Sequence, residues 1–369
     1  MKWLYGILCL FFLIVFHEFG HFLAAKLFGV KVESFSIGFG PVLLHRRVRG
    51  TDYRLSLIPL GGYCGMKGEK DFQKAIEEKL SEINGEPDSL YGIHPFKRAL
   101  IGFAGPFFNF IFAVIACSFI NGIGYTYYTY SNRILINDQV TSSVARDAGI
   151  ISGDRVISIN NKSISDFSEL VEEISSRPDE DVKIQVDRQG KLLDFIIHVE
   201  LDKSTGTGKI GVAADTSEVL EKETPDYGFF ASIGHGFLDA LNSVVLTIKG
   251  IGILFKGVDM NNAVSGPARI TEMLGSTVKE GFSEGLRIGF ISLMSMLSII
   301  SISLFIMNLL PVPILDGGLI LIAFIEIIIR RRINPRIQYY VQFIGLAFIA
   351  LLFIIGVKGD ILFFLNRGK

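Results

Sequence analysis

The sequence of 369 residues has few of the residues that mark several common classes of protein. Its three cysteines, Cys9, Cys64 and Cys117, lie far apart and form no C-x-x-C pair. Because two of them fall in apolar runs, they indicate packing thiols and neither disulfides nor zinc ligands. Lysine and arginine number 36 against 37 aspartate and glutamate, so the formal charge of −1 gives no general attraction to nucleic acid. We therefore expect no nucleic-acid partner.

Charged residues are also scarce, at 20% of the chain against 49% hydrophobic, and the mean hydropathy is +0.44. A helix crosses the hydrocarbon core of a bilayer with about 20 apolar residues. Uncharged runs of this length occupy residues 99–123, 288–310 and 339–357. Residues 3–25 form a fourth candidate, which polar groups interrupt after Phe16. The sequence predicts a polytopic α-helical membrane protein with four transmembrane helices in a lipid bilayer.

A secretory signal is the alternative interpretation of residues 3–25. Lys2 precedes an apolar stretch, and Leu23-Ala24-Ala25 would make a poor cleavage site. Three ionisable groups just before this site are atypical of the apolar part of a signal. An uncleaved helix is therefore favoured.

Basic residues near the helix ends predict the orientation, because short loops rich in lysine and arginine stay cytoplasmic. Residues 26–54 contain six basic residues against two acidic ones, and four arginines lie between positions 330 and 336. With four spans, these two segments lie on the same side of the membrane. Both termini and residues 124–287 are then expected to be extracytoplasmic.

Patterning within the loops predicts four regions. Residues 1–123 form the N-terminal part of a membrane domain, with a cytoplasmic loop and β-hairpin at 26–98, and residues 288–369 form its C-terminal part. Residues 124–218 are expected to be a β-rich domain, with strands at 133–137, 155–160, 181–187 and 193–199 and a helix at 166–174. Turn residues separate these strands at 160–161 and 189–190. Residues 219–287 are expected to be an amphipathic juxtamembrane segment, with a surface helix at 229–255.

Residues 53–63 alternate in polarity and then reach Pro59, Gly61 and Gly62. The run is too short to cross a membrane as a helix. Two interpretations remain open on these residues alone, an ordinary cytoplasmic hairpin and a pair of strands that dips toward the membrane.

The polar interruption of the first apolar segment is His17-Glu18-Phe19-Gly20-His21, an H-E-x-x-H pattern. Residues four apart on a helix share a face, so both imidazoles can point at one metal ion while Glu18 reaches a water on that ion. Ionisable groups within a span are costly unless they line a protein cavity and find partners. A metal site is therefore favoured over the alternative, a buried polar network.

Zinc in a catalytic site takes three protein ligands and leaves a fourth position to water. Asp316 is the candidate third ligand, because it is the lone acid between residues 288 and 325 and the predicted orientation places it at the depth of the histidines. Pro311 and Pro313 are expected to break the helix before it. An interfacial carboxylate is the alternative role.

Five segments together carry a family resemblance: residues 17–21, Ile58-Pro-Leu-Gly-Gly-Tyr63, Gly102-Phe-Ala-Gly-Pro-Phe-Phe-Asn109, the segment from Ala148 to Asn160, and Asn308 through Asp316-Gly-Gly. Their order resembles the site-2 proteases, specifically the RseP-type bacterial intramembrane zinc proteases. The resemblance covers nearly the whole chain. Family members often have histidine after Asp-Gly-Gly, where this sequence has Leu319, but that position is not a ligand in the family.

This resemblance implies a Zn²⁺ ion held by His17, His21 and Asp316, with Glu18 as the catalytic base. It implies that the hairpin is membrane-associated and that substrate contacts are made by Asn308 and by Tyr53, Leu55, Leu57, Pro59, Gly61 and Gly62. It also implies that the β-rich domain is a PDZ domain, present once here where the RseP type carries two. The expected protein is a zinc metalloendopeptidase of the bacterial inner membrane, with its active site toward the cytoplasmic side. Its expected substrates are single-pass membrane proteins such as anti-sigma factors or remnant signal peptides, cut within their transmembrane segments.

Two other classes of function compete with proteolysis. A membrane-anchored PDZ scaffold or zinc-dependent regulator would use the same domains without turnover. A metal transporter would use the intramembrane histidines and aspartate as a pathway, but residues 99–123 and 339–357 contain no acidic or histidine side chain.

Overall fold

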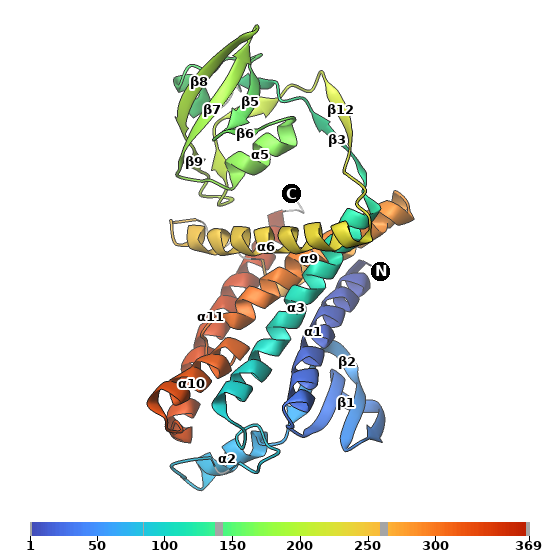
Figure 1. The fold of residues 1–369 in the computed structure, drawn as a ribbon, viewed down its shortest axis with the longest axis vertical. Helices are drawn as coiled ribbons and strands as arrows, with labels where there is room; N and C mark the ends of the chain where they lie inside the picture. The colour runs from blue at the N-terminus through green and yellow to red at the C-terminus, as the bar shows by residue number, and fades with distance from the viewer. Residues whose placement is uncertain (1, 84, 137–142, 259–264, 367–369) are drawn as a thin grey trace. The chain divides into compact units, whose positions relative to one another are not determined.

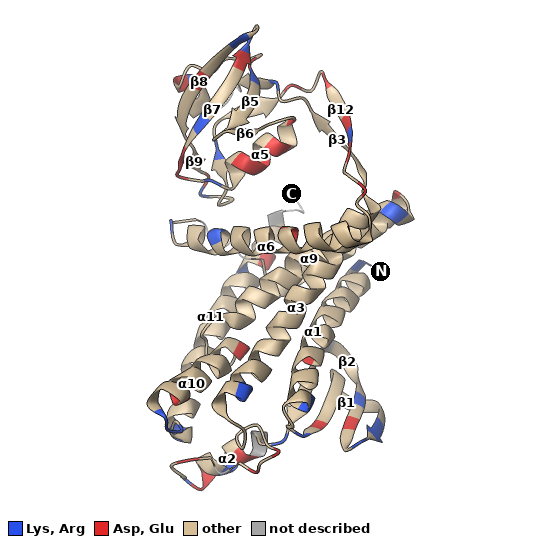
Figure 2. Cartoon of the chain, viewed as in Figure 1, with Lys and Arg blue, Asp and Glu red and all other residues tan. Residues whose placement is uncertain are grey.

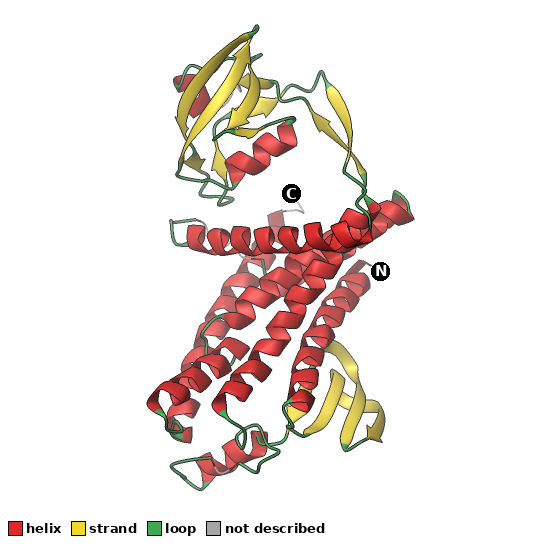
Figure 3. Ribbon diagram, viewed as in Figure 1, coloured by secondary structure: helices red, strands yellow, loops and turns green. Residues whose placement is uncertain are grey.

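The computed structural model describes residues 2–83, 85–136, 143–258 and 265–366 (Figures 1 and 3). The chain divides into two compact units. The first comprises residues 1–122, 228–244 and 265–369, and the second comprises residues 123–227 and 245–264. Helices dominate the first unit and strands the second.

Long apolar helices build the first unit, in keeping with a membrane protein. The four predicted spans are helices α1 (Lys2–Leu27), α3 (Pro95–Ile123), α9 (Leu286–Leu309) and α11 (Pro335–Asn366). Figure 2 shows their ribbons uncoloured over most of their length, whereas coloured charged residues gather on the loops and strands. Helix α6 (Phe229–Leu254), expected on the membrane surface, is also long and apolar enough to cross a membrane. The chain thus has five candidate spans among its described residues, by length and composition.

Helix α8 (Pro267–Ser283), which the sequence did not predict, packs backbone to backbone against α1. A Cβ atom added to Gly6 would lie 2.0 Å from the carbonyl oxygen of Thr271, and one added to Gly275 would lie 1.9 Å from that of Lys2. The Lys2 ammonium also bonds the buried carboxylate of Glu272 at 2.8 Å. These contacts fix the start of α1.

The break expected at Pro311 and Pro313 is present. Helix α9 ends at Leu309, and α10 (Asp316–Ile329) begins after a six-residue turn. A Cβ on Gly317 would lie 2.2 Å from the Leu310 carbonyl oxygen, so the turn folds tightly over the start of α10. Asp316 therefore occupies the first turn of a new helix.

The predicted hairpin consists of two long, irregular antiparallel strands, β1 (Val32–Val48) and β2 (Thr51–Met66), followed by the short helix α2 (Glu69–Glu77). The hairpin folds back on itself, because Phe35 pairs with both Cys64 and Tyr53. Tyr53 in turn pairs with Arg46, so it has a neighbour on each side. Gly62, by contrast, has a paired neighbour on one side only, Ile37. The final arm of β2, residues 61–66, is therefore an edge of this sheet.

The second unit contains a four-stranded sheet of order β6-β5-β7-β8, formed by β5 (Arg155–Ile159), β6 (Lys162–Ser163), β7 (Asp181–Arg188) and β8 (Lys191–His198). Helix α5 (Phe167–Ser175) contributes Leu170 and Ile174 to its core. Shorter elements complete the unit: β3 (Thr126–Tyr130) pairs with β12 (Val219–Glu223), β4 (Ile134–Ile136) with β11 (Val212–Ala214), β9 (Glu200–Leu201) with β10 (Gly208–Lys209), and α4 covers Val144–Asp147.

The predicted strands and helix of this unit are confirmed at β4, β5, β7, β8 and α5, although Asn137, the predicted end of the first strand, lies outside the described residues. The predicted turns are present too. Asn160 and Asn161 have φ angles of 47° and 66°, and Gln189 has 56°, the left-handed values that tight hairpin turns require. Pairing of β3 with β12 and of β4 with β11 joins residues far apart in sequence, which local patterns do not reveal.

Asp166 links α5 to strand β12. Its buried carboxylate accepts a hydrogen bond from the Glu169 backbone N–H at 3.0 Å, as an N-cap, and another from the Lys222 ammonium. Although burial raises the pKa of Asp166, these two donors hold it below its ordinary value. A carboxyl with a lowered pKa stabilises the folded state above its unfolded-state pKa of about 3.9, and this stabilisation is lost as the pH falls.

We expect Asp166→Ala to lower the free energy of unfolding of the second unit by about 2 kcal/mol at pH 7, because the helix loses its cap and Lys222 its partner. Asp166→Asn should keep the cap and lose less. Because asparagine does not titrate, the free energy of unfolding of Asp166→Asn should also fall less than that of the wild type below about pH 4. Hydrogen exchange of the α5 amides in the full chain measures both effects. Equal acid sensitivity of wild type and Asp166→Asn would contradict this role.

Candidate metal centre

Helix α1 and the first turn of α10 bring three predicted metal ligands together. His17 and His21 are buried on one face of α1, and Asp316 faces them from α10. The Nε2 atom of His17 lies 3.1 Å from Asp316 Oδ2, and that of His21 lies 3.2 Å from Asp316 Oδ1. One nitrogen or oxygen of each residue lies within 4.8 Å of those of the other two, so the group could hold a metal ion.

The spacing of these atoms suits zinc. The two Nε2 atoms of His17 and His21 are 3.2 Å apart. A tetrahedral zinc site with bonds of about 2.0–2.1 Å separates its ligand atoms by about 3.3 Å. Two imidazoles and one carboxylate are also the donors of a catalytic zinc site, which keeps its fourth position for water or substrate.

The second nitrogen of each imidazole decides whether Nε2 is free to bind a metal. His21 Nδ1 lies 2.8 Å from the carbonyl oxygen of Ile101, which can only accept, so Nδ1 carries a proton, and in the neutral imidazole Nε2 has the lone pair. A hydrogen bond of this kind fixes the tautomer of a metal-binding histidine.

Asn109 of α3 does the same for His17. Its side-chain nitrogen lies 3.1 Å from His17 Nδ1, and its buried Oδ1 has no hydrogen-bond partner. Rotating the amide by half a turn would let Oδ1 accept the Nδ1 proton of His17, which leaves Nε2 of that ring without a proton. The Ser301 hydroxyl donates to the Asn109 backbone carbonyl at 2.8 Å, which ties α9 to this part of α3.

Gly105 of α3 leaves the space in front of the two histidines. A Cβ at this position would lie 2.2 Å from His21 Nε2 and 2.8 Å from His17 Nε2, on the atoms that would bind the metal. Gly20 of α1 packs against the same helix, because its Cβ would lie 2.4 Å from the Ala104 carbonyl oxygen. The missing side chains at these two glycines therefore shape the centre.

Glu18 lies beside the three predicted ligands, close enough to interact electrostatically with His17, His21 and Asp316. Its Oε2 accepts a hydrogen bond of 3.1 Å from the backbone N–H of Cys64, in the edge arm of β2. Since Cys64 pairs with Phe35 in β1, the Glu18 carboxylate accepts its hydrogen bond on the other side of this arm, at the edge of the sheet.

The predicted substrate positions fall on two elements. Six of them lie on β2, where Tyr53, Leu55 and Leu57 have exposed side chains and Gly62 stands next to Glu18, its added Cβ lying 3.8 Å from Glu18 Cγ. Asn308 lies in the last turn of α9 and is partly exposed, and its side chain makes no hydrogen bond within the described part of the chain.

The sequence of residues 5–352 matches peptidase family M50. The chain therefore belongs to this family, the site-2 proteases. Similar proteins include one from Treponema pallidum, which is 35% identical, with 98% of this chain and 99% of that protein aligned. A Campylobacter jejuni protein is 34% identical, with 98% and 93% aligned, and a Helicobacter pylori protein is 30% identical, with 96% and 98% aligned. All three bear names that describe zinc metalloproteases, and members of the family depend on zinc, so zinc is the cofactor.

Gly105 and Asn109 were not predicted as parts of the centre. Both belong to the Gly102–Asn109 motif, which the sequence analysis used only as a mark of the family. A polar asparagine within an uncharged span was the available signal, because a buried amide needs a partner. The position of Gly105 opposite the histidines depends on how α3 packs against α1, which no local pattern fixes.

We expect Gly105→Ala to lose most of its zinc, because the new methyl group would occupy the space in front of the two Nε2 atoms. Gly122→Ala on the same helix is the matched control, since its nearest atom would be the rotatable Ser232 hydroxyl at 3.2 Å. Zinc per chain, measured on both purified variants by atomic emission, tests this. Wild-type zinc content in Gly105→Ala would show that the ion binds elsewhere.

Proposed function

We propose that this protein is an intramembrane zinc metalloendopeptidase that hydrolyses peptide bonds within transmembrane segments of single-pass membrane proteins. One observation carries the proposal: His17, His21 and Asp316 converge at ligand spacing, and the Glu18 carboxylate lies between them and the edge arm of β2. In this proposal the two histidines and the aspartate hold the zinc ion. The arrangement combines a metal site with a base and a surface for an extended peptide.

Zinc held at this centre would activate a water molecule and polarise the scissile carbonyl group. Glu18 then acts as the general base: its carboxylate takes the water proton and returns it to the leaving amine. Ile101 and Asn109 hold the protons of His21 and His17 on Nδ1, away from the ion. Because α1 carries both histidines and Glu18, one rigid helix sets the distance between base and metal.

A helical substrate must unwind before cleavage, since its backbone carbonyls are already hydrogen-bonded. An extended segment could pair with the edge of β2 at Gly61 and Gly62, while the exposed side chains of Tyr53, Leu55, Leu57 and Pro59, together with Asn308, contact it. Such pairing would compete for the Cys64 N–H, which Glu18 occupies without substrate. Substrate binding would thus release the carboxylate for catalysis.

Contacts between two loops support four membrane crossings. Arg332 donates to the Ile93 carbonyl at 3.4 Å, and Arg336 donates to the Lys79 carbonyl at 3.3 Å. Loops in contact lie on one side of a membrane, so the chain crosses an even number of times between them. Helices α3 and α9 provide two crossings, which leaves α6 on the surface. With α1 and α11, the total is four.

The basic loops place this side in the cytoplasm, with both termini outside and the active site toward the cytoplasmic side of the bacterial inner membrane. Residues 124–218 are then a single extracytoplasmic PDZ-like domain, and residues 219–287 a juxtamembrane segment, between the two parts of the membrane domain at 1–123 and 288–369. Substrates trimmed outside, such as anti-sigma factors or remnant signal peptides, fit this arrangement.

Glu18→Gln should bind zinc but lose activity by at least about a hundredfold, because glutamine cannot take up the water proton. We expect short single-pass fragments to accumulate in membranes of cells that express this variant, relative to wild type at equal abundance. Comparison of the two membrane proteomes identifies them. Identical proteomes under several stresses, with zinc bound in both proteins, would favour a scaffold without turnover.

The four-crossing arrangement predicts that Lys256, just after α6, lies on the same side as Lys191 and opposite Lys74. Single cysteines at these positions, in a chain with its own cysteines replaced by alanine, are labelled with a membrane-impermeant maleimide. In intact spheroplasts, positions 256 and 191 should react and position 74 should not. Labelling at 256 only after permeabilisation would mean that α6 crosses the membrane.

A further inference from the structure

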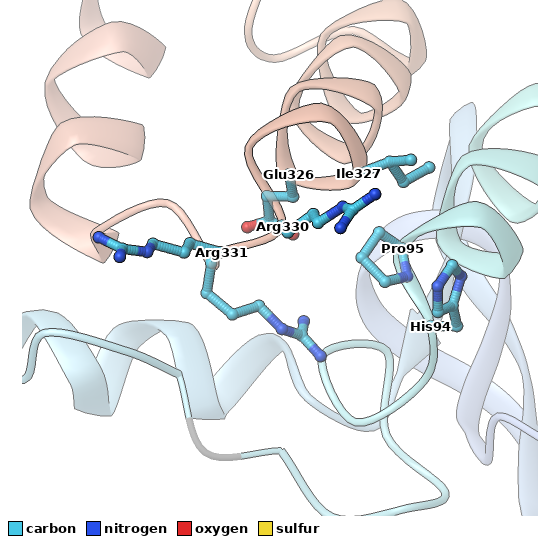
Figure 4. A pocket seen from close by; sticks show the side chains of 7 residues that line it. His94, Pro95, Glu326, Ile327, Arg330 and Arg331 are labelled. Atoms are coloured by element: carbon cyan, nitrogen blue, oxygen red, sulfur yellow. The ribbon is translucent and has the colours of Figure 1, made fainter.

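A basic cavity of about 440 Å³ lies at the C-terminal end of α10, far along the helix from Asp316. His94 and Pro95, at the start of α3, line one side, and Glu326, Ile327 and residues 330–332 line the other (Figure 4). The fourteen residues of α10 separate this cavity from the metal ligand by roughly 20 Å. The cavity therefore plays no direct part in the proposed chemistry.

The only acidic side chain that lines the cavity is already engaged. Glu326 forms a buried ion pair with Arg98 of α3 and accepts a hydrogen bond of 2.9 Å from the Ile333 backbone N–H. Arg330 and Arg331 form no ion pair with any residue that the structure describes. Arg330 and Arg331 thus present positive charge to the cavity without an ion-pair partner in the described chain.

Arg332 adds an unmet hydrogen-bonding requirement. Its Nη2 donates to the Ile93 carbonyl, but its Nη1 is buried and has no hydrogen-bond partner among the described residues. Burial and the neighbouring Arg98 guanidinium lower the pKa of Arg332 below its ordinary value. A partly buried cation in such surroundings is stabilised by an anion that accepts hydrogen bonds from its N–H groups, and guanidinium groups match the geometry of phosphate oxygens.

The surface next to the cavity is apolar. Ile328 is 78% exposed, and Phe324 and Ile329 are each almost half exposed on the same helix. A charged cavity that opens beside such a surface suits an amphiphile whose head is anionic and whose tail is hydrocarbon. Basic pockets at the cytoplasmic ends of membrane helices bind anionic lipid headgroups by the same combination.

We propose that this cavity binds the phosphate of an anionic phospholipid whose acyl chains lie along the exposed face of α10. The volume is within the range of small-ligand sites. Arg330, Arg331 and Arg332 would supply the charge, and Ile327 and Ile328 the contact with the chains. The bound lipid would brace α10 against α3, the two helices that the Arg98–Glu326 ion pair joins.

Native mass spectrometry of the full-length protein in neutral detergent tests this proposal with phosphatidylglycerol as the probe and phosphatidylcholine as the neutral lipid. The variant is Arg330→Gln/Arg331→Gln. Its charge-matched control is Arg46→Gln/Arg49→Gln, two exposed arginines of the hairpin. We expect phosphatidylglycerol to bind wild type and control with affinities within about twofold, and the variant about tenfold or more weakly. Phosphatidylcholine should not compete.

Three results would overturn the proposal. Equal weakening in the variant and the control would indicate a general charge effect. Displacement of phosphatidylglycerol by millimolar inorganic phosphate would assign the cavity to free phosphate. Unchanged binding in the variant would place the lipid elsewhere. Zinc content and melting temperature report on folding, and if the double variant fails to fold, Arg331→Gln alone should still weaken binding, because this side chain is exposed.

Discussion

The close approach of α1 to α3 is the contact on which the rest of the centre depends. Gly20 lets α1 reach the backbone of α3, and Gly105 leaves the two imidazoles room for an ion. At this distance α3 also supplies the groups that orient the ligands, the Ile101 carbonyl for His21 and the Asn109 amide for His17. A methyl group added at either glycine would change the distance between α1 and α3 or fill the space in front of the imidazoles, and it would disturb the hydrogen bonds that set the histidine tautomers. The histidines can therefore bind a metal only in the context of this helix pair.

The sequence predicted metal ligands at these positions because each residue is polar in an apolar run. His17, Glu18 and His21 interrupt the first segment, and Asp316 stands alone after two prolines, so the cost of unpaired polar groups in a membrane required them to meet. The sequence gives no such indication for Gly105, because a single glycine in an apolar helix does not predict which residues it will face. The same holds for α8, whose glycines make sense only against the backbone of α1.

Local patterns also found the long strands of the second unit and the hairpin, but not how their arms pair. Alternation from Tyr53 to Tyr63 identifies strand, yet it cannot tell that the Tyr53 arm has neighbours on both sides while the Gly62 arm is an edge. Bulges shift the register several times along β1 and β2, so the edge arises from long-range pairing. Helix α6 shows a second limit of local patterns. Its length and composition would permit it to cross the membrane, and only the contacts of residues 332 and 336 with residues 93 and 79 bear on whether it does so.

Helix α10 links the predicted metal centre to the start of α3. Its first turn presents Asp316 to the histidines, and its last turn holds Glu326 against Arg98 at the start of α3. A buried ion pair gains little net stability, because both charges lose their hydration, but it penalises any arrangement in which one charge is left alone. The pair therefore restricts sliding of α10 along α3. Asp316 must stay within about 3 Å of His17 and His21 on α1 for the three residues to hold one ion. By fixing the position of α10, the Arg98–Glu326 ion pair contributes more to the geometry of these predicted metal ligands than to the stability of the fold.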